Sequence, residues 1–269
     1  MGYRMGTILV DPDLCTRCGT CTVVCPSSII DAADEDALPG VPEGKAGMCI
    51  ACGHCEAFCP AGALLLNVGP EEKVSIPTGA GTLSPGDLGV YLQKRRSVRR
   101  YTGEPVPRET ILAVLDIVRY APSGGNGQPV EWIVVHDPQG VRTVAALTVD
   151  WMKILAESRH PMSGYVPGLI RAWEAGNDVI CRGAPHLLVA HIPEGSPVAS
   201  AHFDVAAPAF GIGTCWAGFV SMAAAAYEPL QRELGILAGR KFAYAMLFGN
   251  PQHTVHGIPR RNPVRVTWR

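Results

Sequence analysis

The sequence predicts an α+β protein of two domains, with a small cysteine-rich domain followed by a larger domain in which helices flank a mixed sheet. Eight of the ten cysteines lie within residues 15–60. Beyond residue 83, apolar residues recur at helical and strand spacing without a long parallel βαβ series. A length of 269 residues suits one large or two modest domains. We place the first domain at 1–68, a linker at 69–86 and the second domain at 87–269.

The cysteines form two copies of one pattern, with three cysteines at every third position and a fourth directly before a proline. The copies are Cys15, Cys18, Cys21 and Cys25, and then Cys49, Cys52, Cys55 and Cys59. This run is the bacterial signature for [4Fe–4S] ligation, in which the fourth cysteine serves the other cluster. We therefore predict one cluster on Cys15, Cys18, Cys21 and Cys59, and a second on Cys49, Cys52, Cys55 and Cys25.

Zinc and disulfides are the alternatives for so many cysteines. Structural zinc usually takes cysteines in pairs, four ligands to an ion, and disulfide frameworks belong to small secreted chains. Neither explains why both copies end in Cys-Pro. Residues 7–67 resemble a bacterial two-cluster ferredoxin, and this resemblance implies an electron-carrying module without specifying a reaction.

Charge and hydropathy narrow the class of protein. The net charge of −1 argues against nucleic acid as a main partner. Residues 1–68 carry a net charge of −5 and the remainder +4, so we expect the second domain to use positive charge. The first ten residues lack the apolar region of a signal peptide, and no apolar run reaches the ~18 residues of a membrane span. With reduced cysteines, this predicts a cytoplasmic protein without a membrane partner.

Apolar spacing and turn residues predict the elements. In the first domain we expect strands at 7–10, 29–30 and 64–66, with a solvated acidic connection at 31–47. In the second domain we expect helices at 85–95, from Pro107 onward, through most of 138–180 with a break near 161–167, and at 199–210, with extended segments at 131–136, 184–191, 214–220 and 242–248. Ser84, Pro85 and Asp87 mark the first helix start. The second helix should bury Ile111, Leu112, Leu115 and Val118 on one face.

Four stretches of the second domain carry candidate binding residues. Residues 94–101 read Lys-Arg-Arg-Ser-Val-Arg-Arg-Tyr, and 259–263 read Pro-Arg-Arg-Asn-Pro. The glycines of loop 121–129 allow close approach to a flat ligand, and its Ser, Asn and Gln can bind a ring edge. In 211–218, Trp216 stands where a dinucleotide fingerprint needs its third glycine, which excludes a Rossmann site.

In this order, the four stretches resemble the motifs of the FMN-dependent nitroreductase family over residues 87–269. The whole chain then resembles a ferredoxin–nitroreductase fusion. The resemblance implies an intimate homodimer with FMN at its interface. It also implies that FMN and two [4Fe–4S] clusters are the cofactors.

The resemblance carries roles over by position. It places Arg95, Arg96, Ser97 and Arg99 in the FMN-binding opening, with Arg95 and Arg261 at the phosphate, Arg260 beside them and Arg99 toward the flavin pyrimidine. It implies that Pro122 and Ser123 reach the flavin from the partner subunit and that Asn126 hydrogen-bonds the ring edge, with Gln128 in the same loop. Ala217 and Gly218 match the position where a backbone N–H faces flavin N5, so that these two and Arg99 are the catalytic candidates. Many relatives carry an acid at the Ala217 position, and its absence leaves the proton donor unassigned.

The expected function is an FMN-dependent oxidoreductase that passes electrons from an external donor through the clusters to FMN and on to a small conjugated acceptor, by analogy a nitroaromatic or quinone. The donor would be an external ferredoxin or NAD(P)H. Two alternatives stay open: an NAD(P)H-dependent FMN reductase that sends electrons out through the clusters, and a non-catalytic electron carrier or redox sensor. We expect Cys181 and Cys215 to be buried hydrophobic residues rather than ligands.

Overall fold

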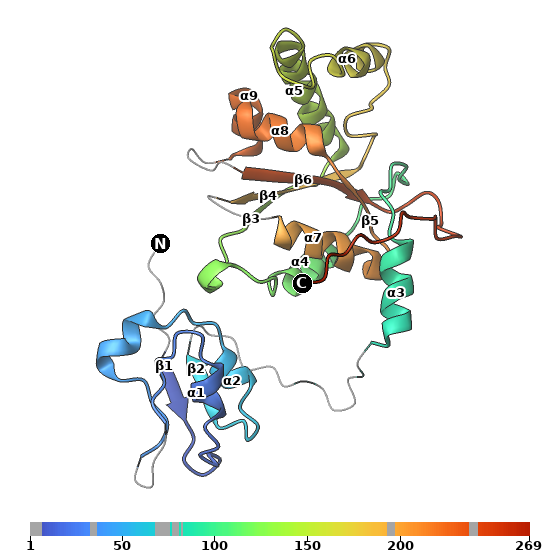
Figure 1. Cartoon of the computed structure of the whole chain (residues 1–269). Helices are drawn as coiled ribbons and strands as arrows, with labels where there is room; N and C mark the ends of the chain where they lie inside the picture. The colour runs from blue at the N-terminus through green and yellow to red at the C-terminus, as the bar shows by residue number, and fades with distance from the viewer. Residues whose placement is uncertain are drawn as a thin grey trace. The chain divides into compact units, whose positions relative to one another are not determined.

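The computed structural model describes residues 7–32, 37–67, 76, 81, 83–192, 197–236 and 242–269. The chain forms two compact units, of which the first comprises residues 1–82 with 123–128 and the second 83–122 with 129–269 (Figure 1). The predicted linker at 69–86 lies mostly outside the described residues, and its last residues already belong to a helix. Within the described ranges, no helix is long and apolar enough to cross a lipid bilayer.

The first unit is built on one antiparallel strand pair, in which β1 (Thr7–Val10) runs beside β2 (Leu64–Asn67). Its helices are α1 (Thr20–Val24), η1 (Glu43–Met48) and α2 (His54–Ala57). Ile29 and Ile30 are buried with Cys21, Cys55 and Leu64 in a small core. The strand predicted at 29–30 is wrong, because these residues lie in irregular backbone and pairing begins at Asp31, in an isolated bridge with Gly40.

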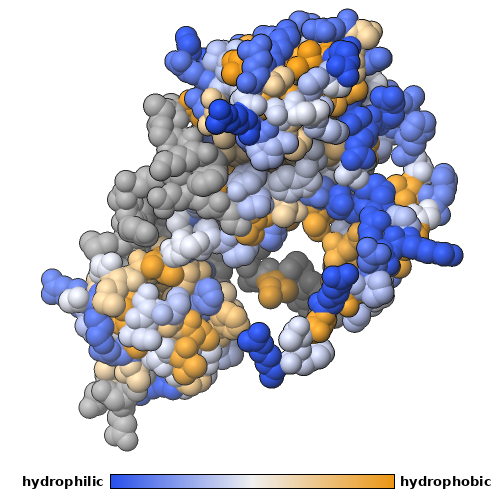
Figure 2. All heavy atoms as spheres, turned by 45° about the horizontal axis from the view of Figure 1, so that its top comes forward, coloured by the Kyte–Doolittle hydropathy of each residue, from blue (hydrophilic) through white to orange (hydrophobic). Residues whose placement is uncertain are grey.

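Apolar side chains also reach the surface of this unit, in the lower left of Figure 2. Val23, Phe58 and Met48 are among the exposed ones. A domain of this size buries too little apolar surface for a large stability of its own, and such domains often depend on bound metal.

The two cysteine loops of the first unit have the same backbone form. Arg17 and Ala51 occupy matching positions and have left-handed φ values of 56° and 51°. Gly19 and Gly53, which precede α1 and α2, both have φ of 73°. A left-handed φ is energetically unfavourable for Arg and Ala. Its recurrence at matched positions therefore indicates that both loops require this backbone conformation.

The second unit contains a four-stranded sheet in the order β3-β4-β6-β5. The strands are β3 (Glu131–Val135), β4 (His186–Ile192), β5 (Gly213–Trp216) and β6 (Phe242–Gly249). All three pairings between these strands are antiparallel. The four strands are thus antiparallel to one another, and the parallel pairing of a mixed sheet is present, within the described ranges, as an isolated bridge from Ser97 to Thr214.

Helices cover both faces of this sheet (Figure 1). On one face lie α5 (Pro138–Ala156), α8 (Gly218–Ala226) and α9 (Glu228–Leu234), whose core includes Leu187 and Val189 of β4. On the other lie α4 (Arg108–Val118) and α7 (Val198–Ala206), against Leu188 of the same strand. Alternate residues of β4 thus serve opposite cores, as the period of a strand requires. The unit also contains α3 (Pro85–Lys94), α6 (Val166–Glu174) and η3 (Ala207–Phe210), while η2 (Gly124–Asn126) belongs to the first unit.

Most predicted elements of this unit are present. The start at Ser84 is confirmed, because its hydroxyl accepts a 3.0 Å hydrogen bond from the Asp87 amide. The buried face of α4 is partly wrong, since Leu112 is 65% exposed and Val114 is fully buried instead. The segment expected to be extended through 214–220 changes to a helix at Gly218, because β5 ends at Trp216. Cys181 and Cys215 are buried, as predicted.

Two stacked histidines connect the sheet to the segment before α4. The rings of His136 and His186 lie 4.4 Å apart between centroids. The His186 ring accepts from the Val106 amide at 2.9 Å through Nε2 and donates to the His136 carbonyl at 2.9 Å through Nδ1. Burial, with a smaller effect of His136, lowers the pKa of His186 to about 4.

This depressed pKa predicts that low pH destabilises the second unit. Between the ordinary value of 6.5 and about 4, the unfolded chain binds a proton at His186 that the folded chain does not, so stability falls as pH falls through this window. One proton contributes a slope of up to about 1.4 kcal/mol per pH unit. Urea unfolding can be followed by tryptophan fluorescence, because all five tryptophans lie in this unit. The slope should be shallower in His186→Gln, and equal slopes in both proteins would contradict the assignment.

Candidate functional site

Two cavities of the first unit are each lined by four cysteines. One contains Cys15, Cys18, Cys21 and Cys59, and the other Cys49, Cys52, Cys55 and Cys25. These sets match the two predicted ligand sets, including the exchange of the fourth cysteine between the loops. The cysteines reach their cavities because each loop turns through its left-handed residues before a short helix begins at Thr20 or His54.

The donor sets suit clusters better than single metal ions. Among the described residues, no three Cys, His, Asp or Glu side chains are grouped closely enough to hold one ion. The four thiols of each cavity line one common space, whereas structural zinc takes four ligands around a single ion. Thiolate sets of this kind are typical ligands of [4Fe–4S] clusters.

A group of three arginines forms the candidate anion site of the second unit. Arg95 and Arg96 follow directly after α3, and Arg261 comes from the C-terminal segment. Burial, together with the positive charges of Arg261 and Arg95, lowers the pKa of Arg96. Arg96 Nε is buried and has no hydrogen-bond partner among the described residues. Three neighbouring guanidinium groups with an unpaired donor suit a phosphate, which Arg binds through charge-assisted, often bidentate bonds.

The edge of the sheet positions this arginine segment. The Val98 amide donates to the Thr214 carbonyl at 2.8 Å, beside the bridge from Ser97. A Cβ on Gly213 would lie 2.6 Å from a Val98 methyl group, so only glycine allows the segment to approach β5 this closely. The motifs 94–101 and 211–218, far apart in sequence, are therefore adjacent because of one glycine.

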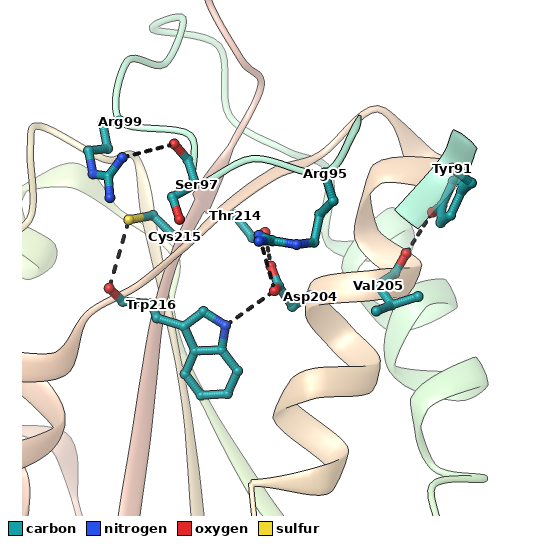
Figure 3. A network of polar contacts seen from close by, with 9 residues as sticks. All are labelled: Tyr91, Arg95, Ser97, Arg99, Asp204, Val205, Thr214, Cys215 and Trp216. Carbon is teal, nitrogen blue, oxygen red and sulfur yellow. Dashed lines mark hydrogen bonds and ion pairs between the residues drawn. The ribbon is translucent and has the colours of Figure 1, made fainter. Parts of the chain in front are cut away.

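A buried carboxylate that the sequence reasoning missed lies at the centre of this arrangement (Figure 3). Asp204 of α7 pairs with Arg95 at 3.3 Å. It also accepts hydrogen bonds from the Thr214 hydroxyl at 2.5 Å and the Trp216 indole at 3.2 Å. The Tyr91 hydroxyl ties α3 to the same helix through the Val205 carbonyl at 2.6 Å. The available sequence signal was an acidic residue within an otherwise largely apolar helix.

The remaining predicted residues of this unit differ in exposure and in the hydrogen bonds that they make. Arg99 is exposed and donates weakly to the Ser97 carbonyl, at 3.4 Å. Arg260 is exposed, and its carbonyl accepts from Arg261. The Ala217 amide already donates to the Ala245 carbonyl at 2.9 Å, so it is not available to face a flavin. Of the two predicted amides, that of Gly218 remains, at the exposed first position of α8.

The loop at residues 121–129 is divided between the two units. Pro122 belongs to the second unit, whereas Ser123, Asn126 and Gln128 belong to the first. Asn126 Nδ2 of the side chain donates to the carbonyls of Ile50 at 3.3 Å and Ala51 at 2.9 Å, in the second cysteine loop. Asn126 Oδ1 accepts from Gln128 Nε2 at 3.3 Å, and the Ser123 hydroxyl accepts from the Gln128 amide at 3.0 Å. These side chains are therefore engaged within the first unit.

Fold and site together define a protein that joins a small domain with two four-cysteine cavities to an α+β domain with an arginine-rich anion site. The chain belongs to the nitroreductase family, whose family model matches residues 92–250. A 4Fe-4S dicluster domain matches residues 7–64, so the chain is a fusion of the two.

Similar proteins include an NADH dehydrogenase of Thermus thermophilus, 43% identical over 63 residues, which are 23% of this chain and 31% of that protein. An FMN reductase [NAD(P)H] of Bacillus subtilis is 39% identical over 56 residues, 21% of this chain and 22% of that protein. The chain thus matches about a third or less of either relative's length. The structure of a nitroreductase with bound FMN from Desulfitobacterium hafniense is similar with a TM-score of 0.52 at 23% identity, over 66% of this chain and 96% of that one. This likeness supports the fold.

Paired cysteine substitutions test the exchange of the fourth ligand. Cys25→Ala with Cys49→Ala removes two thiols from one cavity and should leave about four of about eight irons per chain. Cys15→Ala with Cys25→Ala removes one thiol from each cavity and should leave almost none. The measurement is iron and acid-labile sulfide in anaerobically reconstituted protein, with Cys181→Ala as the control that keeps both clusters. The opposite order of retention would show that each loop supplies all four of its own ligands.

Proposed function

We propose that this chain is an oxidoreductase that binds FMN and two [4Fe–4S] clusters and reduces a small conjugated acceptor, such as a nitroaromatic or a quinone. The observation that carries the proposal is the arginine group, with its unpaired Arg96 Nε, beside β5 in a member of the nitroreductase family. The FMN in the Desulfitobacterium structure and the name of the Bacillus relative support the choice of ligand.

In this proposal Arg95, Arg96 and Arg261 bind the FMN phosphate, and Asp204 orients Arg95 toward it. The Gly218 amide, at the start of α8, faces the flavin ring, where the positive end of the helix favours negative charge. Arg99 would add a cation near the ring. We leave Ala217 and Asn126 out of the flavin contacts, because their donors are used elsewhere.

Bound flavin would supply two-electron chemistry and bound clusters one-electron transfer, which gives a reason for joining the two domains in one chain. We propose reduced ferredoxin as the donor to the clusters. The protein would act as a homodimer in which Pro122 and Ser123 approach the partner's flavin, as the family resemblance implies.

A second candidate is an FMN reductase that takes hydride from NAD(P)H and sends electrons out through the clusters. The Bacillus relative, an FMN reductase [NAD(P)H] by name, favours it. The two candidates share the flavin site and differ in the direction in which electrons cross the first unit.

Substitution of the arginines tests the flavin site. Arg95→Ala and Arg261→Ala should each weaken FMN binding by about 1.5–3 kcal/mol, the usual loss for a charged hydrogen-bond partner. The affinity can be measured by titrating the FMN-free protein with FMN and following flavin fluorescence. The iron content should stay unchanged. Arg232→Ala is a matched control, because Arg232 is an exposed arginine of α9 paired with Glu228. Parental affinity in both site variants would place the phosphate elsewhere.

Removal of residues 1–68 tests the direction of electron flow. The second unit has its own cores on both faces of its sheet, so the truncated protein should stay folded and retain FMN. Dithionite should still drive reduction of a nitroaromatic, since a small reductant reaches the flavin directly, whereas turnover driven by reduced ferredoxin should be largely lost. If NADH drives both forms equally and ferredoxin drives neither, the second candidate is correct.

A further inference from the structure

The two cysteine loops allow a residue-by-residue comparison, because their backbones match. Loop 1 (residues 15–21) has Thr16, Arg17 and Thr20 between its cysteines, where loop 2 (residues 49–55) has Ile50, Ala51 and His54. The φ values match at residues 17 and 51 and at residues 19 and 53, so the side chains of the two loops project from backbones of the same form. Differences between the two cavities therefore come from the side chains.

The first difference is a hydroxyl beside a ligand sulfur. Thr20 Oγ1 lies 3.2 Å from Cys18 Sγ. A thiolate that binds iron carries no proton, so the hydroxyl must be the donor in the loaded protein. The matched residue in loop 2, His54, is exposed, and its ring faces Phe58 at 5.8 Å between centroids.

The second difference is the polarity of the surroundings. The cavity of Cys15, Cys18, Cys21 and Cys59 is also lined by Thr16, Arg17 and Thr20, and Cys18 is exposed. The cavity of Cys49, Cys52, Cys55 and Cys25 is lined mainly by apolar residues, among them Ile8, Ile29, Ile30, Ile50 and Leu66, and also by Ser27 and His54. Reduction adds one negative charge to a cluster. Hydrogen bonds to sulfur, positive charge and solvent favour that charge, whereas an apolar lining opposes it.

We propose that the two clusters have unequal reduction potentials, with the Cys15–Cys18–Cys21–Cys59 cluster the higher, and that Thr20 and Arg17 set the difference. This inference rests on the cluster binding in the proposed function. An electron that enters the first unit then resides on this exposed cluster, from which it can exchange with an external carrier. The cluster in the apolar cavity is reduced only at lower potential.

The test is an anaerobic redox titration of the full-length protein with dithionite, followed by electron paramagnetic resonance. The parent should show two midpoint potentials. Thr20→Val keeps the shape and removes the hydroxyl, so it should lower the higher potential alone. A hydrogen bond to a charged acceptor typically changes an equilibrium by about tenfold, or about 59 mV for one electron. Thr20→Ser should restore the parental value.

Two further variants distinguish a change in reduction potential from loss of a cluster. Arg17→Ala should also lower only the higher potential, and its backbone is tolerated because Ala51 has the same left-handed φ in loop 2. His54→Thr places a hydroxyl at the matched position and should raise the lower potential. Equal potentials in the parent, or a Thr20→Val protein with about eight irons and unchanged potentials, would overturn the inference. If Thr20→Val loses a cluster, an unchanged lower potential in His54→Thr overturns it. Absence of clusters from the parent would instead refute the proposed function.

Discussion

The arrangement of the candidate flavin site depends on one buried carboxylate. Asp204 is 7% exposed, and a carboxylate in such a place is costly unless it is paired and hydrogen-bonded. Arg95, Thr214 and Trp216 supply the partners, so this single charge fastens the segment after α3 and the strand β5 to helix α7. Gly213 lets the same segment fit against β5 by shape. A guanidinium oriented in advance loses less freedom when a ligand arrives, which is the physical basis of preorganised binding.

The first unit obtains two environments from one repeated form. Its loops have the same left-handed positions, and yet one cavity has two threonines and an arginine in its lining while the lining of the other is mostly aliphatic. The backbone fixes where four thiols can stand, and the intervening side chains fix how the surroundings respond to charge. The cysteines and the residues that set the polarity of each cavity thus occupy different positions of the same short stretch.

Several features of the fold and of the cysteine sites were predictable from local sequence signals. Cysteine spacing predicted the two sets of four thiols, because ligand spacing is a local property of the sequence. The start of α3 was predictable because the Ser84 hydroxyl caps the helix three residues away, at Asp87. Leu112 and Val114 are both apolar, and only packing decides which is buried. The start of α8 was missed because no side chain caps it. Asp204 escaped notice because its partners lie outside its own helix, with Thr214 and Trp216 on β5 and Arg95 after α3, so only the folded chain brings them to the carboxylate.

The exchange of Cys25 and Cys59 between the two cavities has a consequence for how such a unit can change. Each half of the repeat lines its own cavity with three thiols and the other half's cavity with the fourth. Neither half is therefore a complete site, and loss of either one leaves the survivor a thiol short. The unit cannot be shortened to a one-cluster module by removing half of it. Its two halves must be kept, duplicated or lost together.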